Sequence, residues 1–312
     1  MPRERSSYSS GLLYGLIAYG LWGLFPLYFS LFDGVSPLEV VAHRIVWSLV
    51  FIVIVLLFMR KWRSFIAVFR DKRSVGLLAL AAIFIAINWG TYVYAIESDH
   101  VVQASLGYLI NPLVSVALGV IVLRERLRNL QWVAVAIAAI AVIYLTFATG
   151  AFPWISLTLA FSFAMYGLAK KLAGVDAVQS LGVETALLTP IAMLFMIVMV
   201  GRHNAAFPSS DLRLSVLLML LGPVTAIPLL AFGAATNRIP LSTLGLMQYI
   251  TPLLQFIIGV YIFGEVMSLA GWIGFAIVWV AVLIFAFDTV KHRNDHTKLS
   301  ENIEALEVSD TA

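Results

Sequence analysis

Ten long apolar runs constrain this chain more than any other feature of its 312 residues. A helix needs roughly 20 apolar residues to cross the hydrocarbon of a bilayer. The longest uncharged stretch is divided at Gly150 and Pro153, because these residue types mark a turn. The runs cover residues 11–32, 37–59, 75–96, 101–123, 130–148, 152–171, 177–200, 213–236, 240–263 and 269–288. The pattern predicts an all-α membrane protein with ten transmembrane helices.

The composition supports this assignment and excludes several other classes. Hydrophobic residues make up 61% of the chain and charged residues only 12%, whereas a soluble domain carries about 25% charged residues. The absence of cysteine excludes disulfides, thiolate metal sites and cysteine nucleophiles. The net charge of +3 comes from Lys and Arg in short loops, so a nucleic-acid partner is not expected and membrane orientation explains the charge.

The distribution of Lys and Arg predicts which side each loop occupies. With both chain ends in the cytoplasm, 17 of the 20 Lys and Arg residues lie in cytoplasmic segments, and Arg202 and Arg213 are the external ones. Cytoplasmic loops of membrane proteins carry an excess of positive charge. The sequence therefore predicts a multi-pass protein of the cytoplasmic (inner) membrane with both termini inside.

Residues Val101–Trp132 and Leu241–Trp272 align without a gap at a shift of 140. The matches that are hardest to obtain by chance are Pro112 with Pro252, Gly119 with Gly259, Glu125 with Glu265 and Trp132 with Trp272. Each half then holds five spans, an odd number, so the halves insert with opposite orientation. We expect a cytoplasmic N-terminus (1–10), a first repeat (11–148), an inverted second repeat (152–288) and a disordered cytoplasmic tail (289–312).

Two ionisable residues lie inside predicted spans, where they are costly unless they face a cavity or a partner. Arg44 is in the second span, and Glu184 lies 140 residues later in the seventh. The hypothesis is that these opposite charges pair, or alternate between each other and a substrate. The alternative is that both side chains snorkel to the interface.

Polar stripes flank the two prolines, which remove a backbone donor from the middle of a helix and kink it. They indicate either a water-filled path or hydrogen bonds between helices. A third polar and aromatic face lies in the span at 75–96. The candidate substrate-binding residues are His43, Arg44, Asn88, Trp89, Tyr92, Tyr108, Asn111, Glu184, Gln248, Tyr249 and Thr251, with Pro112 and Pro252 as helix-kink positions.

No catalytic, cofactor or metal signature is present in the sequence. We find no H-E-x-x-H, G-x-S-x-G, Walker A or Rossmann glycine pattern, and the five histidines have no metal-ligand spacing. We therefore expect no enzyme, no cofactor and no metal. Any energy source would be an ion gradient, an exchanged solute or the gradient of the substrate.

Several motifs resemble the EamA-type branch of the drug/metabolite transporter superfamily, and in detail the RarD family of predicted permeases. They are Gly20-Leu21-Trp22-Gly23, Ala42-His43-Arg44, Asn88-Trp89, Ala104 to Leu113 (ASLGYLINPL) and Leu244 to Ile250 (LGLMQYI). The resemblance covers about residues 11–288. It implies a bacterial-type permease of the cytoplasmic membrane. Related branches export amino acids and other metabolites, so efflux is the expected direction.

The predicted function is thus a secondary transporter for a small metabolite or drug-like solute, working by alternating access at a site near the middle of the membrane. Arg44 would bind a carboxylate or phosphate, and Glu184 could bind an ammonium group. The alternative is a membrane sensor or scaffold that transports nothing. The expected partners are the solute and the lipid bilayer, and a homodimer is left open beside a monomer.

Overall fold

The computed structural model describes residues 2–32, 34–98, 100–149, 153–202, 205–208, 211–264, 266 and 268–310. Every regular element within these residues is a helix, and no strand occurs among them. The helices are α1 (Pro2–Gly23), α2 (Phe25–Phe29), α3 (Pro37–Phe58), α4 (Trp62–Val68), α5 (Lys72–Glu97), α6 (Val101–Ile121), α7 (Asn129–Thr149), α8 (Trp154–Ala173), α9 (Ala177–Gly201), α10 (Leu212–Thr236), α11 (Leu241–Met247), α12 (Ile250–Tyr261) and α13 (Leu269–Asp310).

Nine segments within the described residues are long and apolar enough to cross a membrane. The pairs α1–α2 and α11–α12 each supply one of them. The sixth predicted span forms the 20-residue helix α8 but is not among the nine. Its serines and its two lysines, Lys170 and Lys171, lower its hydropathy, and most of these polar side chains are buried against neighbouring helices. A helix surrounded by protein has less need of an apolar surface.

Local sequence sets several helix ends. Asp71, Asp176 and Asp211 precede α5, α9 and α10, and each carboxylate accepts a hydrogen bond from the backbone N–H two residues later. Such caps satisfy donors that the first turn of a helix leaves unpaired. Helix α8 ends at Gly174, whose φ of 60° is the left-handed conformation that glycine adopts without strain.

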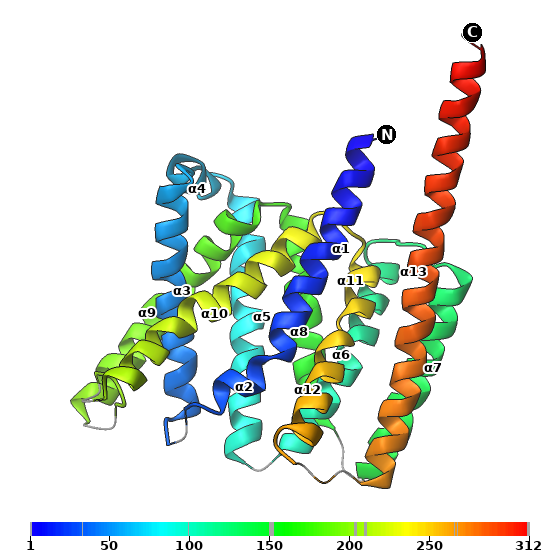
Figure 1. The fold of residues 1–312 in the computed structure, drawn as a ribbon. Coiled ribbons are helices and arrows are strands. Elements are labelled where there is room, and N and C mark those ends of the chain that lie inside the picture. Colours follow the sequence, from blue (N-terminus) through cyan, green and yellow to red (C-terminus); the bar gives the residue numbers. More distant parts are fainter. Residues whose placement is uncertain are drawn as a thin grey trace.

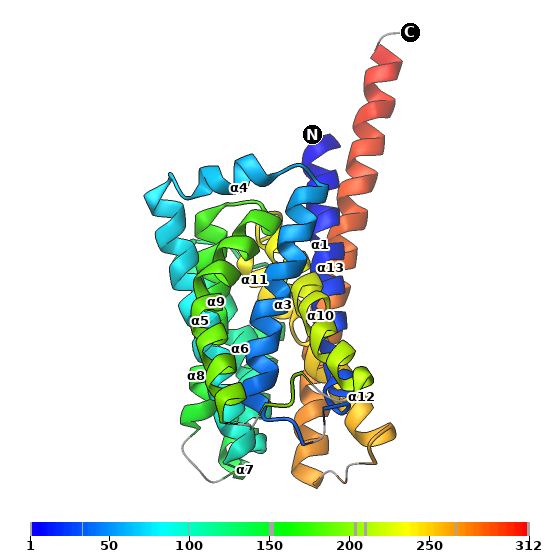
Figure 2. The same cartoon turned by 90° about the vertical axis from the view of Figure 1, so that its left-hand side faces the viewer.

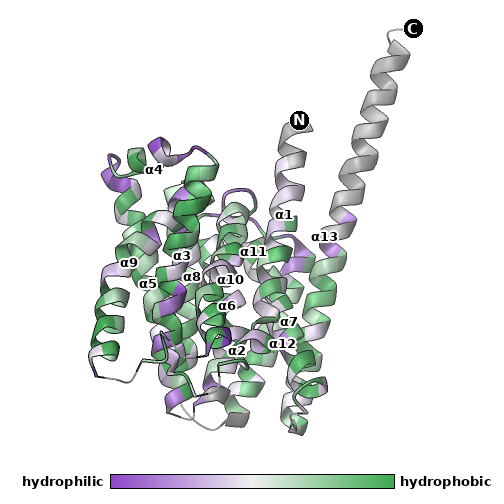
Figure 3. Cartoon of the chain, turned by 60° about the vertical axis from the view of Figure 1, so that its left-hand side comes forward, coloured by the Kyte–Doolittle hydropathy of each residue, from purple (hydrophilic) through white to green (hydrophobic). Residues whose placement is uncertain are grey.

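Both chain ends and α4 lie at the same end of the helix bundle (Figures 1 and 2). Contacts join the connections of this end: Lys61 Nζ is 3.3 Å from Asp176 Oδ2, and Asn237 Nδ2 donates to the Val175 carbonyl. We call this the basic end, because the connections around residues 60–73, 122–128 and 237–240 carry most of the Lys and Arg outside helices. Hydrophilic residues gather at both ends of the bundle and hydrophobic ones between them (Figure 3).

The helices pack in a small number of extended pairs. The main pairs are α3 with α9, α3 with α10, α6 with α8, α6 with α11, α5 with α8, α1 with α10 and α7 with α13. Glycines permit the closest approaches. A side chain at Gly245 of α11 would meet Ser115 and the Pro112 carbonyl of α6. The core between these helices is apolar, with Tyr19, Tyr166 and Tyr249 as its largest fully buried side chains.

The two prolines predicted to kink their helices behave differently. Helix α6 is one continuous helix through Pro112, so the chain is not interrupted there, and the kink at Pro112 stays a prediction. The equivalent segment is interrupted at Gln248 and Tyr249, between α11 and α12, and Pro252 lies in the first turn of α12. A proline in a first turn costs little, because that N–H has no partner within the helix.

Two further expectations concern the C-terminal tail and the match of Glu125 with Glu265. The tail at 289–312 was expected to be disordered, whereas α13 continues through it to Asp310. The Glu, Leu, Lys and Ala residues of this segment are strong helix formers, which explains the correction. Glu265, the expected match of Glu125, lies outside the described residues.

Candidate functional site

A cavity of about 180 Å³ lies within the membrane-spanning part of the bundle. Helices α1, α2, α3, α5, α6, α8, α10 and the α11–α12 segment all contribute to its wall. Its lining includes seven of the predicted site residues: Arg44, Asn88, Trp89, Tyr92, Tyr108, Gln248 and Thr251, together with Pro252. Residues that are far apart in the sequence thus meet around one space. The volume is below the roughly 300–1,000 Å³ of typical ligand pockets, so the space fits only a small solute.

Arg44 is the charged group of this cavity, and it is 8% exposed. Its guanidinium carbon lies 4.3 Å from the ring centroid of Trp89 and 5.5 Å from that of Phe29. Its Nε donates to Thr225 Oγ1 at 3.1 Å. Among the described residues no carboxylate lies within ion-pair distance of Arg44. Aromatic faces stabilise the buried cation and leave the guanidinium without a counter-ion.

Hydroxyl and amide groups surround the same space. The rings of Tyr92 and Tyr108 lie 6.0 Å apart. Asn88 Nδ2 donates to the Leu159 carbonyl at 2.9 Å, which fixes the amide at the wall. Gln248 Oε1 is buried without a hydrogen-bond partner. A buried acceptor without a donor is costly, so Gln248 is suited to accept a hydrogen bond from a bound molecule.

The interruption between α11 and α12 brings Gln248 to the wall of the cavity. The backbone N–H of Gln248 donates to the Gly245 carbonyl, and that of Thr251 donates to the Gln248 carbonyl. These are the tighter bonds of a 3₁₀ turn. The side chain of Thr251 donates to the Tyr19 carbonyl at 2.9 Å, which ties the turn to α1.

His43 is directed away from the cavity and is fully buried. Its Nδ1 accepts a hydrogen bond from Trp47 Nε1 at 3.0 Å, so its Nε2 carries the proton in the neutral ring. That Nε2 lies 3.8 Å from Glu39 Oε1. Glu39 in turn accepts from the backbone N–H of Ala206 and Phe207. His43 therefore belongs to a contact that holds the loop before α10.

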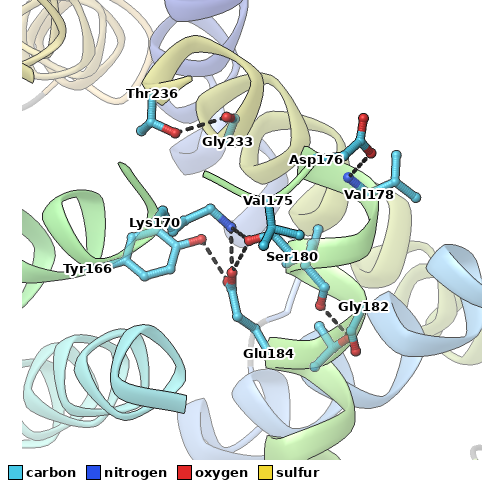
Figure 4. Close-up of polar contacts among 12 residues, drawn as sticks. Tyr166, Lys170, Val175, Asp176, Val178, Ser180, Gly182, Glu184, Gly233 and Thr236 are labelled. Atoms are coloured by element: carbon cyan, nitrogen blue, oxygen red, sulfur yellow. Dashed lines mark hydrogen bonds and ion pairs between the residues drawn. The ribbon is translucent and has the colours of Figure 1, made fainter. Parts of the chain in front are cut away.

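Glu184 is also outside the cavity lining, and it does not pair with Arg44. Its Oε1 lies 2.5 Å from Lys170 Nζ and accepts from Ser180 Oγ at 2.7 Å. Its Oε2 accepts from Tyr166 Oη at 3.0 Å. Figure 4 shows the Tyr166, Lys170 and Ser180 side chains converging on this carboxylate. The expected Arg44–Glu184 pair is therefore corrected, because Lys170 of the adjacent helix already neutralises Glu184.

Lys170 ends an apolar run, where a basic residue is usually an interfacial anchor, yet it is only 3% exposed. Helical spacing contains a signal that could have located it. Tyr166 and Lys170 are four residues apart on α8, and Ser180 and Glu184 are four apart on α9. Each pair lies on one helix face, and the short connection at 174–176 brings the two faces together.

The remaining predicted residues, Asn111 and Tyr249, are buried between helices. Both are 1% exposed and neither lines the cavity. Asn111 Oδ1 accepts from Ser115 Oγ at 3.4 Å. The Tyr249 hydroxyl donates to the Leu109 carbonyl at 3.2 Å. Their place is in the packing between helices beside the cavity.

A layer of aromatic side chains separates the cavity from the Lys170–Glu184 pair. Trp22 and Phe163 line the cavity, and each packs on Phe232, at centroid distances of 5.7 and 5.4 Å. Phe232 stacks on Tyr166 with an interplanar angle of 12°. We call Trp22, Phe163, Tyr166 and Phe232 the aromatic layer. It closes the side of the cavity that faces the ion pair.

The described residues contain no group of three or more His, Asp or Glu side chains that could hold a metal ion. The chemistry of the cavity is thus that of one cation, several hydroxyl and amide groups, and aromatic rings. Such a set binds and orients an anion, since guanidinium recognises carboxylate and phosphate by paired hydrogen bonds.

Comparison with known proteins relates the whole chain to one group. The model of the EamA-like transporter family matches residues 9–147. A protein named RarD from Streptomyces exfoliatus is 47% identical over 282 residues, which cover 90% of each chain. The uncharacterised transporter YojE of Bacillus subtilis strain 168 is 40% identical over 291 residues, 92% of this chain and 97% of its own.

Two more comparisons extend this result. The RarD protein of Escherichia coli strain K12 is 39% identical over 280 residues, 90% of this chain and 95% of its own. One solved crystal structure superposes with a TM-score of 0.70 at 19% identity, covering 90% of this chain and 98% of the other. At that identity the likeness concerns the fold alone.

Proposed function

Since the chain belongs to the RarD-like, EamA-type branch of the drug/metabolite transporter superfamily, we propose that it is a permease for a small solute carrying a carboxylate or phosphate. Its membership confirms the family resemblance seen in the sequence motifs. The family consists of multi-pass membrane proteins, and its members' names describe transporters. The solute and the mechanism are the parts that we propose.

One observation carries the choice of solute: a buried guanidinium in a cavity with no acidic partner among the described residues. A charge inside a membrane protein is costly unless it is paired. Within the described part of the chain, Arg44 receives only aromatic contacts and one hydroxyl acceptor. An anionic solute would supply the missing counter-ion. Because Glu184 is occupied by Lys170, an ammonium group would find no carboxylate at this wall, which favours an anion over a zwitterion.

We propose that the fold consists of two inverted five-helix repeats, 11–148 and 152–288. Structural features that recur at positions 140 residues apart support this proposal. Arg124 and Gly264 both have positive φ, 56° and 68°. The bond from Leu123 N–H to the Leu118 carbonyl recurs between Phe263 and Ile258. The helix pairs α3–α9, α6–α11 and α7–α13 each join equivalent spans.

Other helix pairs also match when each span is replaced by its equivalent in the other half. The pair α5–α8 then corresponds to α1–α10, and α3–α10 corresponds to α5–α9. A two-fold axis between the halves explains these correspondences. The bond between the equivalent residues Tyr249 and Leu109 fits a position close to that axis. In an inverted-repeat transporter the solute site lies between the repeats, near the middle of the membrane.

We propose that the aromatic layer is the barrier on one side of this site. It comes from α1, α8 and α10, and it stands between the cavity and the Lys170–Glu184 pair near the basic end. Alternating access would require these rings to separate. At the same time α2 and the end of the bundle opposite the basic end would close over the cavity. The excess of Lys and Arg at the basic end supports its placement in the cytoplasm, which gives an inner-membrane protein with both termini inside.

The proposal is tested with purified protein in liposomes. We expect small carboxylates or phosphates to raise the melting temperature and to exchange across the bilayer, whereas neutral and cationic analogues of similar size do neither. The Arg44→Gln variant should lose most of this binding, by about 1.5–3 kcal/mol or tenfold to more than a hundredfold, because a charged hydrogen bond is removed.

Arg213→Gln is the matched control, since Arg213 is an exposed arginine in the first turn of α10 and its removal should leave binding unchanged. Inside-out vesicles test the direction expected of an exporter. A folded protein that binds and transports no member of an anion panel would contradict the proposal and support the sensor or scaffold alternative. Equal binding by wild type and Arg44→Gln would contradict the role of Arg44.

A further inference from the structure

A second and larger space, of about 1,000 Å³, opens on the outside of the bundle at the basic end. Its floor is α10. One side is α1, and the other is the connection that follows α3, at Met59 and Lys61, together with the start of α9. Both sides pack on α10, but α1 and α3 have no extended packing with each other in the described part of the chain. Figure 1 shows α10 crossing the bundle obliquely between them. We call this space the α10 groove.

The two faces of α10 separate the groove from the solute cavity. The groove is lined by residues that follow helical spacing along one side of α10, namely Ile227, Leu230, Ala231 and Ala234, and by Arg238 just after the helix. The opposite side faces the interior, where it provides the contact to Arg44 and a ring of the aromatic layer. The groove therefore lies on the outer surface of the bundle, where a lipid of the surrounding bilayer can reach it.

The part of the groove away from the basic end is apolar and accessible. Ile17 of α1 is 39% exposed and Ile227 of α10 is 45% exposed, and both line the space. Met59, which is 46% exposed, continues the apolar lining up to the rim. Exposed aliphatic side chains at membrane depth are suited to contact with acyl chains, which have the same polarity.

The rim at the basic end is positively charged. Lys61 lies 3.3 Å from Asp176, the one acidic residue among the lining residues. Lys171 Nζ donates to the Thr236 and Ile239 carbonyls, and Glu125 lies 4.0 Å away, held by the backbone N–H groups of α11. Arg238 Nη1 donates to the Ala234 carbonyl. Each of the three cations has N–H donors beyond these bonds, so the rim retains both charge and donors.

We propose that the α10 groove binds one anionic phospholipid, with its phosphate at Lys61, Lys171 and Arg238 and its acyl chains along the apolar side of α10. Basic pockets between transmembrane helices bind anionic headgroups in this way. The basic rim binds the phosphate charge of the lipid. The exposed aliphatic side chains contact its acyl chains, which a soluble phosphate lacks. The proposal depends on the proposed function only for the leaflet, which is cytoplasmic if the basic end lies inside.

The test measures retained lipid by native mass spectrometry of the detergent-purified protein. We expect one phosphatidylglycerol to bind in preference to phosphatidylcholine. The double variant Lys61→Gln/Arg238→Gln should weaken that binding about tenfold or more, since each basic residue near an anionic surface contributes about 1 kcal/mol. The control Arg70→Gln/Arg73→Gln removes the same charge from exposed residues at the basic end outside the groove.

A third variant, Ala234→Phe, changes no charge and places a ring in the groove, so it should also lower phosphatidylglycerol retention. Equal loss in the control pair would overturn the proposal in favour of general surface attraction. Equal binding of the two lipids, or displacement of phosphatidylglycerol by glycerol phosphate alone, would overturn it too. The readout requires no transport, so a failed anion assay and a failed lipid assay remain distinguishable.

Discussion

At the scale of single residues, the two ionisable groups found inside predicted spans take different roles. The sequence located both Arg44 and Glu184, because charges in apolar runs are rare and visible. The sequence could not assign their partners, because a separation of 140 residues along the chain does not show whether two side chains are in contact. Lys170 ends an apolar run, the usual place of an anchor, and only the fold shows that its side chain turns inward to Glu184.

The Lys170–Glu184 pair leads to a stability prediction. Lys170→Met leaves a buried carboxylate without its cation, and we expect it to lower the free energy of unfolding by about 3–5 kcal/mol. The double variant Lys170→Met/Glu184→Leu should recover part of that loss, because it leaves no unpaired charge, although Tyr166 and Ser180 lose their acceptor. Thermal and denaturant unfolding in a fixed detergent measure both.

The exposed pair of Lys61 and Asp176, with side chains 35% and 46% exposed, is the control for this prediction. Lys61→Met should change stability by less than about 1 kcal/mol. A double variant at 170 and 184 that is as unstable as the single variant would show that the charges are not the cause.

At the scale of elements, the predicted spans and the helices agree closely, because long apolar runs between turn residues leave few alternatives. The prolines show where this reasoning ends. Pro112 and Pro252 occupy equivalent places, yet α6 continues through the first while the second follows a break. A missing donor permits either outcome. At the break, Tyr249 is bonded to α6 and Thr251 to α1, contacts that the sequence does not reveal.

Glycine positions give a prediction about the packing of α3 on α10. A side chain at Gly222 would overlap the backbone carbonyl of Trp47, and Ser48 Oγ donates to the Gly222 carbonyl at 3.2 Å. Gly222→Ala should therefore push α10 away from α3 and lower stability by about 1–3 kcal/mol. It should also weaken anion binding, because Thr225, the partner of Arg44, lies one turn away.

Gly76→Ala is the matched control, since a Cβ there meets no atom within 4 Å. Because alanine has a higher helix propensity than glycine, this substitution should stabilise the protein by up to about 1 kcal/mol. Melting temperatures of both variants in the same detergent give the comparison. If Gly222→Ala is as stable as the wild type, the prediction that α3 and α10 approach closely at Gly222 is contradicted.

At the scale of the whole molecule, the account depends on two halves that cross the membrane in opposite directions. Composition and the 140-residue shift predicted this arrangement, but a sequence match cannot show that equivalent helices touch. The helix pairs and the recurring backbone geometry at 124 and 264 support it. The cavity then lies where both halves contribute side chains, and its single uncompensated cation belongs to the first half.

Sidedness labelling at two equivalent positions tests this claim most directly. The chain has no cysteine, so Arg126→Cys and Val266→Cys each introduce a single reactive thiol, at exposed positions related by the shift of 140. A membrane-impermeant maleimide is applied to intact cells and to inside-out vesicles. We predict that residue 126 reacts only from the cytoplasmic side and residue 266 only from outside. Labelling of both residues from the same side would contradict the inverted repeat and the transport mechanism built on it.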